Sequence, residues 1–111
     1  MKKICVFTGA ATGHAPAFKN DAYQLGQIIA ARGFGLVYGG GRKGLMGAVA
    51  DGVIASRGYV TGIIPKFLEN VEMGHRGVSD LHVIDTMHER KAMMYDLSDA
   101  FIIMSGGLGT L

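Results

Sequence analysis

A chain of 111 residues has room for one domain, and we expect residues 1–111 to form a single one. Hydrophobic residues make up 49% and charged residues 18%, which predicts a buried core and excludes a disordered chain. The net charge is +2 with basic residues scattered among acidic ones, which argues against a nucleic-acid-binding surface.

The cysteine content and the length of the apolar runs indicate in which cellular compartment the protein occurs. Cys5 is the single cysteine, so no internal disulfide forms, and as a mid-strand residue it is expected to be a buried hydrophobe. No apolar run approaches the ~20 residues of a membrane span, and Met1-Lys2-Lys3 precedes too short an apolar run for a signal peptide. We therefore expect a cytoplasmic protein.

The first part of the chain has the pattern of a strand, a loop and a helix. Lys3–Thr8 is an apolar run of strand length, and the loop Gly9–Gly13 follows it. Pro16 suits the first turn of a helix, and Gly33 is placed to end it. The apolar residues in between recur at helical spacing: Phe18, Ala22, Leu25 and Ile29.

The middle of the chain repeats this pattern. A strand at Phe34–Tyr38 leads into the glycine loop Gly39–Gly44, with the sequence GGGRKG, and then into a helix from about Leu45 to Ser56. That helix is small and apolar around much of its surface, so it should pack tightly against a sheet. The next elements are a strand at Tyr59–Ile64 that Pro65 ends, a mixed-charge loop at Lys66–Asp80 and a strand at Leu81–Ile84.

A helix that begins at Met87 has cations at the end where the helix dipole disfavours them. Thr86 and Glu89 form a Thr-x-x-Glu capping box. Arg90 and Lys91 then fall in the first turns, where the dipole disfavours each exposed cation by up to about 1 kcal/mol. Because an anionic ligand would account for the pair, we expect a binding site that contains Met87, Glu89, Arg90 and Lys91. Glu89 already has a structural task in the cap, so a chemical role for it stays open.

The last predicted strand runs into another glycine loop. Ala100–Met104 is a short apolar run, typical of a strand buried on both faces. Ser105–Thr110 follows with the sequence SGGLGT, and its glycines would let the backbone approach a ligand and point N–H groups at it. We therefore predict a phosphate-binding loop that consists of Gly106, Gly107, Gly109 and Thr110.

Strands that alternate with helices predict right-handed crossovers and a parallel sheet covered on both faces. The expected fold class is α/β, a Rossmann-like doubly wound parallel sheet in three layers. With the common strand order 3-2-1-4-5, the fifth strand lies at an edge, which more chain or another chain should cover. The loops after the first, second and fifth strands should meet at the carboxyl edge, where such folds bind ligands. This adds candidate substrate-binding residues: Gly9, Gly40, Gly41 and Gly44.

Other interpretations of the glycines remain open. Gly39, Gly41 and Gly44 match G-x-G-x-x-G, but a dinucleotide site needs this motif after the first strand and an acidic residue at the end of the next one. Here the next strand ends in Ile63-Ile64-Pro65-Lys66, and no Lys-Ser or Lys-Thr pair completes a Walker motif. The glycines of this loop can also serve only tight turns and close helix contacts.

The histidines and methionines are ambiguous. His14, His75, His82 and His88 show no metal-ligand spacing, so no metal is expected. His82 is expected to be structural, while His88 is a candidate ligand contact. Met87 would either cover a flat base or pack, and core packing is expected for Met93, Met94 and Met104.

Three stretches together carry a family resemblance: GGGRKGLMGAVADG, MHERKAMM and GGLGT. They resemble the LOG ("Lonely Guy") family of cytokinin riboside 5'-monophosphate phosphoribohydrolases, whose members are often mislabelled lysine decarboxylases. The likeness runs from the first strand to the last residue. It implies hydrolysis of the N-glycosidic bond of a nucleoside 5'-monophosphate, either cytokinin riboside monophosphate or AMP, to a free base and ribose 5-phosphate. It also implies a homodimer, and nothing in the chain indicates pyridoxal phosphate or another cofactor.

The resemblance also implies roles for individual residues. Arg90 would be catalytic: it would anchor the substrate and offset charge on the departing base, while the loop that ends at Thr110 would hold the 5'-phosphate. A carboxylate would stabilise the positive charge that develops on the ribose. The family's glutamate falls three residues after Thr110, beyond Leu111. We therefore expect residues 1–111 to be the amino-terminal portion of a longer nucleotide-binding domain, and to lack hydrolase activity alone. Ala10 and Ala11 replace two serines of the family, which removes hydroxyls that could bind the ligand.

Two other classes of function stay open. A carrier of the same superfamily, such as a molybdenum cofactor carrier, would bind a nucleotide or cofactor without turnover. A purely structural α/β fragment would bind no nucleotide. A Glu at the third position after Thr110 would favour the hydrolase over the carrier.

Overall fold

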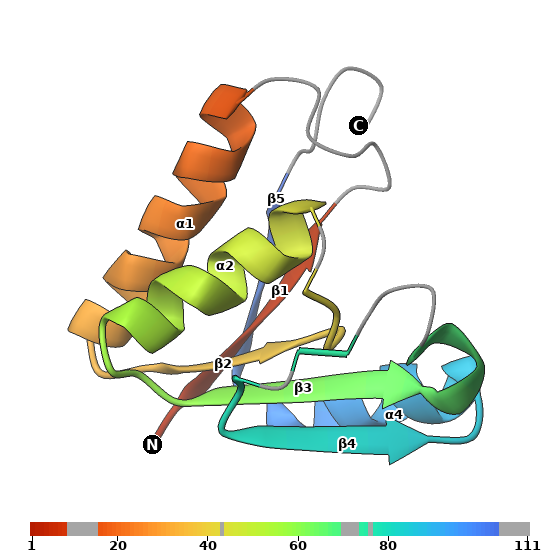
Figure 1. Ribbon diagram of the computed structural model, residues 1–111. Coiled ribbons are helices and arrows are strands. Elements are labelled where there is room, and N and C mark those ends of the chain that lie inside the picture. The colour runs from red at the N-terminus through yellow and green to blue at the C-terminus, as the bar shows by residue number, and fades with distance from the viewer. Residues whose placement is uncertain (9–15, 43, 70–73, 76, 105–111) are drawn as a thin grey trace.

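The computed structural model describes residues 1–8, 16–42, 44–69, 74–75 and 77–104. These residues form one five-stranded β-sheet with helices packed against it (Figure 1). The strands are β1 Lys3–Thr8, β2 Gly35–Tyr38, β3 Val60–Pro65, β4 Asp80–Ile84 and β5 Ala100–Met104. The helices are α1 Pro16–Ala31, α2 Gly44–Ala55, the short 3-10 helix η1 Lys66–Leu68 and α4 Met87–Leu97. The predicted elements are therefore confirmed to within one or two residues, and η1 lies in the segment expected to be a loop. None of the helices in the described ranges is both long and apolar enough to span a bilayer.

The strand order corrects one expectation. All four strand pairings are parallel and the order is β4-β3-β2-β1-β5, so β4 extends the sheet beyond β3 instead of pairing with β1. β5 pairs with β1 along its whole length, from Ile4 opposite Ala100 to Thr8 opposite Met104. The reversal of strand order therefore lies between β1 and β5, because β2, β3 and β4 follow one another on one side of β1, and the chain returns through α4 to place β5 on its other side.

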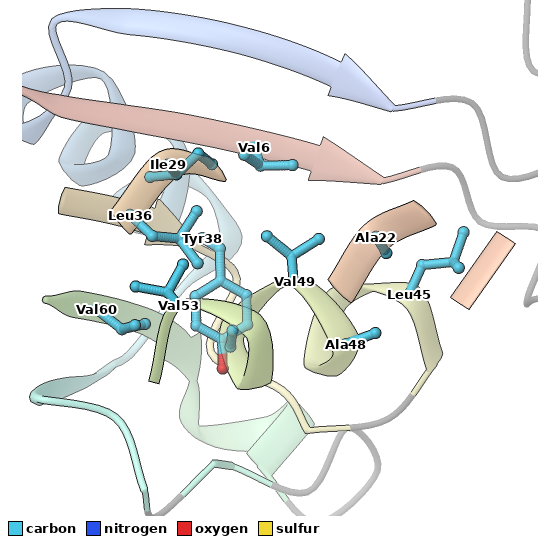
Figure 2. Close-up of a cluster of buried hydrophobic side chains, with 11 residues drawn as sticks. Val6, Ala22, Ile29, Leu36, Tyr38, Leu45, Ala48, Val49, Val53 and Val60 are labelled. Atoms are coloured by element: carbon cyan, nitrogen blue, oxygen red, sulfur yellow. The ribbon is translucent and has the colours of Figure 1, made fainter. Parts of the chain in front are cut away.

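Helices cover both faces of the sheet and give the three predicted layers. α1 and α2 lie on one face and α4 on the other (Figure 1). Between the sheet and the first two helices lies a cluster of buried side chains that includes Leu36, Tyr38, Val49 and Val53 (Figure 2). On the other face a smaller cluster packs under α4 and consists of Cys5, Val37, Ile63 and Met94. Successive residues of β2 thus point into different clusters, as the two-residue period of a strand requires.

α1 and α2 approach each other closely through glycines. A Cβ added to Gly26 would lie 2.9 Å from the backbone nitrogen of Val53, and one added to Gly52 would lie 2.9 Å from the carbonyl carbon of Tyr23. Real Cβ atoms essentially never come this close to backbone atoms. The expectation that the second helix packs tightly is confirmed, and these two glycines permit it.

Burial of the last strand differs from the prediction. We expected both faces of β5 to be buried, but Phe101 is 42% exposed and Ile103 is 77% exposed. β5 is an edge strand in the described sheet, and among the described residues only β1 pairs with it. Tyr95 of α4 and Phe7 of β1 contact the Phe101 ring, with centroid distances of 5.0 and 6.2 Å. An apolar, partly aromatic surface is therefore exposed along this edge.

Candidate active site at the carboxyl edge of the sheet

The start of α4 is fixed by the capping box that the sequence predicts. The Glu89 backbone N–H donates to Thr86 Oγ1 at 3.1 Å, and the Thr86 backbone N–H donates to Glu89 Oε1 at 3.1 Å. Both bonds satisfy backbone donors that the first turn leaves without partners. The Glu89 carboxylate is therefore engaged in the cap. Arg90 follows on the side of the helix that faces the sheet.

Arg90 is a buried cation held by backbone carbonyls. Arg90 is only 8% exposed, although it lies in the first turns of a helix. Nε donates to the carbonyl of Ile63 at 3.0 Å, and Nη2 donates to the carbonyl of Gly39. These acceptors lie at the carboxyl ends of β3 and β2. Removing a guanidinium from water is costly unless its N–H groups are bonded, and the two carbonyls offset part of that cost.

The absence of a side chain at Gly39 makes room for this guanidinium. A Cβ added there would lie 3.1 Å from Arg90 Cζ and 3.0 Å from the sulfur of Met46, and closer still to Arg90 Nη2. Gly40 adopts a φ of +83°, a conformation that residues with side chains rarely take. The glycine loop after β2 is therefore shaped around Arg90.

A cavity of about 200 Å³ adjoins the guanidinium. Its lining is mainly apolar, with two cations and one glycine: Val6, Phe7, Met46, Met87, Met94, Arg90, Lys91 and Gly39. The residues come from β1, from the loop after β2 and from the first turns of α2 and α4. The cavity can thus take a flat apolar ring against methionine side chains and an electron-rich group beside Arg90.

The predicted site residues separate into groups. Met87, Arg90 and Lys91 line the cavity together, and Glu89 is held in the cap. Gly40 and Gly41 are buried next to Gly39 but are not among the residues that line this cavity. Gly44 lines a different and more polar cavity of about 330 Å³, between the first turns of α1 and α2. Gly9, Gly106, Gly107, Gly109 and Thr110 lie outside the described residues, as do Ala10, Ala11 and His14.

Sequence reasoning missed five residues of the cavity lining, among them Gly39, although it belongs to the glycine loop whose other members were expected at the site. Val6 and Phe7 form the carboxyl end of β1, and the rule that ligands bind where strand order reverses could have pointed to them. No sequence pattern distinguishes Met46 and Met94 as cavity-lining residues from methionines that pack in the core. Met94 is indeed also part of the core under α4. The packing role expected for Met93, Met94 and Met104 is confirmed.

The histidines have local partners. His82 Nε2 lies 2.9 Å from Asp80 Oδ2, in agreement with its expected structural role. His75 Nε2 lies 2.6 Å from Asp51 Oδ1. His88 is exposed and is not part of the cavity lining. In the part of the chain that the structure describes, no group of three or more His, Cys, Asp or Glu residues could hold a metal ion.

The parallel sheet, the two helical layers and a cationic cavity at the reversal of strand order define an α/β protein of the Rossmann-like class, with a site suited to an anionic ligand that bears an apolar ring. A family model described as "Possible lysine decarboxylase" matches residues 46–111. The chain belongs to this family.

Several named proteins resemble the chain. It is 46% identical over 109 residues to a probable cytokinin riboside 5'-monophosphate phosphoribohydrolase, LOGL1, of Oryza sativa subsp. japonica, covering 98% of this chain and 49% of the relative. It is 44% identical over 110 residues to a cytokinin riboside 5'-monophosphate phosphoribohydrolase of Rhodococcoides fascians, covering 98% of this chain and 56% of that protein. The chain thus spans about half the length of the curated relatives it matches.

Solved structures agree with the fold. The structure of a molybdenum cofactor binding protein from Rippkaea orientalis superimposes with a TM-score of 0.78 at 29% identity, covering 98% of this chain and 65% of that one. The α/β, Rossmann-like fold class predicted from the sequence is therefore confirmed.

Proposed function

We propose that the protein containing this chain hydrolyses the N-glycosidic bond of a nucleoside 5'-monophosphate, either a cytokinin riboside monophosphate or AMP. The products are a free adenine-type base and ribose 5-phosphate. One observation carries the proposal: Arg90, a buried guanidinium held by the carbonyls of Ile63 and Gly39, borders a cavity lined largely by methionine and other apolar side chains. The resemblance to phosphoribohydrolases supports the choice of reaction.

The arrangement of the cavity fits the charge changes of this reaction. As the bond breaks, negative charge develops on the departing base and positive charge on the ribose. With the base packed against Met46 and Met87, Arg90 would stabilise the negative charge, and it would need no rearrangement because the backbone already fixes it. Lys91, which lines the same cavity, adds a second positive charge for an anionic substrate.

The remaining parts of the mechanism rest on the family resemblance. Gly106, Gly107, Gly109 and Thr110 would hold the 5'-phosphate with backbone N–H groups. A glutamate three residues after Thr110 would stabilise the ribose cation and orient water. None of the cavity-lining residues in the described ranges is a carboxylate.

Arg90 variants test the proposal. Calorimetric titration of residues 1–111 with AMP should show binding, and Arg90→Lys should weaken it by about tenfold, because a lysine keeps the charge but lacks the planar fork of N–H groups that points at both carbonyls and the ligand. Arg57→Lys, an exposed arginine in the turn after α2, is the matched control. Release of free base is followed by chromatography on the complete gene product. Absence of AMP binding by the unaltered chain, or unchanged binding by Arg90→Lys, would contradict the proposal.

A second candidate is binding without turnover, as in a molybdenum cofactor carrier. The likeness to the Rippkaea orientalis protein favours it, and the cavity would suit a flat pterin ring as well as a base. The complete gene product would then bind a nucleotide or pterin phosphate but release no base from AMP. Base release at enzyme-like rates would exclude this candidate.

We further propose that the protein is a cytoplasmic homodimer. Family resemblance supports the dimer, and the free, buried thiol of Cys5 is compatible with a reducing compartment. Light scattering coupled to size-exclusion chromatography tests the dimer, and fractionation of the source cells tests the compartment.

A further inference from the structure

Three consecutive carbonyls of the glycine loop each accept a hydrogen bond from a different part of the chain. Gly39 accepts from Arg90 Nη2, and Gly40 accepts from the backbone N–H of His75 at 2.8 Å. Gly41 accepts from the hydroxyl of Tyr38 at 2.9 Å. Glycine loses more backbone freedom on folding than any other residue, so these bonds are needed to keep a run of glycines in one conformation. The position of the Gly39 carbonyl thus depends on the groups that hold its neighbours.

The segment that holds Gly40 is itself fixed through the ring of His75. The backbone N–H of Gly77 donates to Nδ1 at 3.0 Å, and Nε2 lies 2.6 Å from Asp51 Oδ1. Because Nδ1 accepts a hydrogen bond, the neutral ring carries its proton on Nε2 and donates it to Asp51. The His75 side chain is only 14% exposed, whereas that of Asp51 is 54% exposed, so the pair lies at the surface with its ring largely shielded from water. A bridge between Gly74 and Gly41 adds a second contact between the segment and the loop.

Tyr38 also holds this loop, through a hydrogen bond to the Gly41 carbonyl. The Tyr38 hydroxyl, which is protonated at neutral pH, donates to Gly41, and burial and the negative charge of Asp51 raise its pKa further. Asp51, on the second turn of α2, pairs with the ring of His75. The path of contacts runs from Asp51 to His75, from His75 to Gly40, and from the adjoining Gly39 to Arg90.

We propose that Asp51 and His75 are positioning residues for Arg90. They touch neither the cavity beside Arg90 nor the guanidinium; they fix the loop whose Gly39 carbonyl holds Nη2. Their effect on substrate binding and turnover rests on the proposed function. In that function, displacement of the guanidinium by about 1 Å can lower the rate a hundredfold. Their effect on Arg90 itself does not depend on that function.

The effect of Asp51 and His75 on Arg90 can be measured directly from the rotation rate of the Arg90 guanidinium. ¹⁵N NMR of residues 1–111 without ligand gives the rate at which the two Nη nitrogens exchange places by rotation, and Arg90→Lys identifies the signals by their loss. In His75→Ala the rate should rise about tenfold, the change expected when a hydrogen bond of ordinary strength is weakened. His75→Gln, whose amide can still donate to Asp51, should restore slow rotation. The pair of His82 and Asp80 has similar chemistry on β4, so His82→Ala is the matched control.

Asp51→Ala provides a second test that does not alter a largely buried residue, because the Asp51 side chain is 54% exposed. It should raise the rotation rate as His75→Ala does. Unchanged rotation in both variants overturns the proposal, as does an equal increase in His82→Ala. AMP titration of the same variants should show about fivefold weaker binding, in line with the loss of one hydrogen bond. If rotation responds and the unaltered chain does not bind AMP, the positioning role stands and the proposed function fails.

Discussion

The Arg90 guanidinium occupies the space where a side chain at Gly39 would lie. A Cβ added to Gly39 would be 3.1 Å from Arg90 Cζ, and the Gly39 carbonyl accepts a hydrogen bond from Nη2. The two residues are 51 positions apart in the sequence. One residue thus supplies both the space and an acceptor for the buried cation, and this pairing can be tested by substitution.

Gly39→Ala should displace the guanidinium and weaken AMP binding by about tenfold, since the added methyl group leaves Nη2 no room beside its acceptor. Overpacking should also lower the free energy of unfolding by about 1–3 kcal/mol. Calorimetric titration and urea unfolding measure the two effects. Gly35→Ala, at the other end of β2, is the control, because its closest neighbour is the flexible end of Met1 at 3.0 Å. AMP binding as tight in Gly39→Ala as in the unaltered chain would contradict the expectation.

Thr86→Ala should lower the free energy of unfolding by about 1 kcal/mol, because it removes the oxygen that accepts from the Glu89 N–H. Glu89→Gln keeps a side-chain oxygen for the Thr86 N–H and should retain most of the stability. Urea unfolding followed by circular dichroism gives both values. Glu89→Gln also addresses the open question of a chemical role: if base release by the complete gene product survives this change, Glu89 serves the cap alone.

Gly52→Ala should destabilise the protein by about 1–3 kcal/mol, since the new methyl group would collide with the Tyr23 carbonyl across the contact between α1 and α2. The melting temperature measures the loss. Gly74→Ala is a suitable comparison, because a Cβ there would meet its neighbours at 3.4 Å, an ordinary contact distance. Equal melting temperatures for the two variants would mean that the helices can separate without cost.

Stability should fall as pH rises above 9. Burial raises the pKa of the Cys5 thiol from 9.0 to about 11, an effect that the nearby Ser98 hydroxyl partly opposes. Between these values the unfolded chain loses the thiol proton and the folded chain keeps it, so the contribution of Cys5 is complete below pH 9 and is lost as pH rises toward 11. From pH 8 to pH 10 the free energy of unfolding should fall by up to about 1 kcal/mol more in the unaltered chain than in Cys5→Ala. Equal losses in the two proteins would show that Cys5 ionises alike in both states.

Ile103→Lys should reduce self-association of residues 1–111. Ile103 is 77% exposed on the edge strand β5, and a lysine on an exposed edge opposes strand-to-strand pairing. Sedimentation velocity over a range of concentrations measures the change. Ile28→Lys alters an isoleucine that is 52% exposed on α1, away from any strand edge, and should have a smaller effect. A larger effect of Ile28→Lys would place the associating surface on α1.

The amino-acid sequence by itself determined the secondary structure and the cap of α4. Strand and helix periods act over neighbouring residues, and Thr86 and Glu89 are three positions apart, so these features can be predicted locally. The unfavourable position of Arg90 in the first turns of a helix also marked it as a candidate site residue before its surroundings were known.

Only the tertiary structure decided where β4 and β5 lie in the sheet, that Ile103 is exposed, and that Arg90 is bonded to Gly39. The link between Asp51 and His75 likewise joins residues from separate elements. Such contacts depend on the order in which strands assemble and on where two backbones approach each other. A local pattern does not encode either, because the free energy that selects them comes from burial and hydrogen bonding across the whole domain.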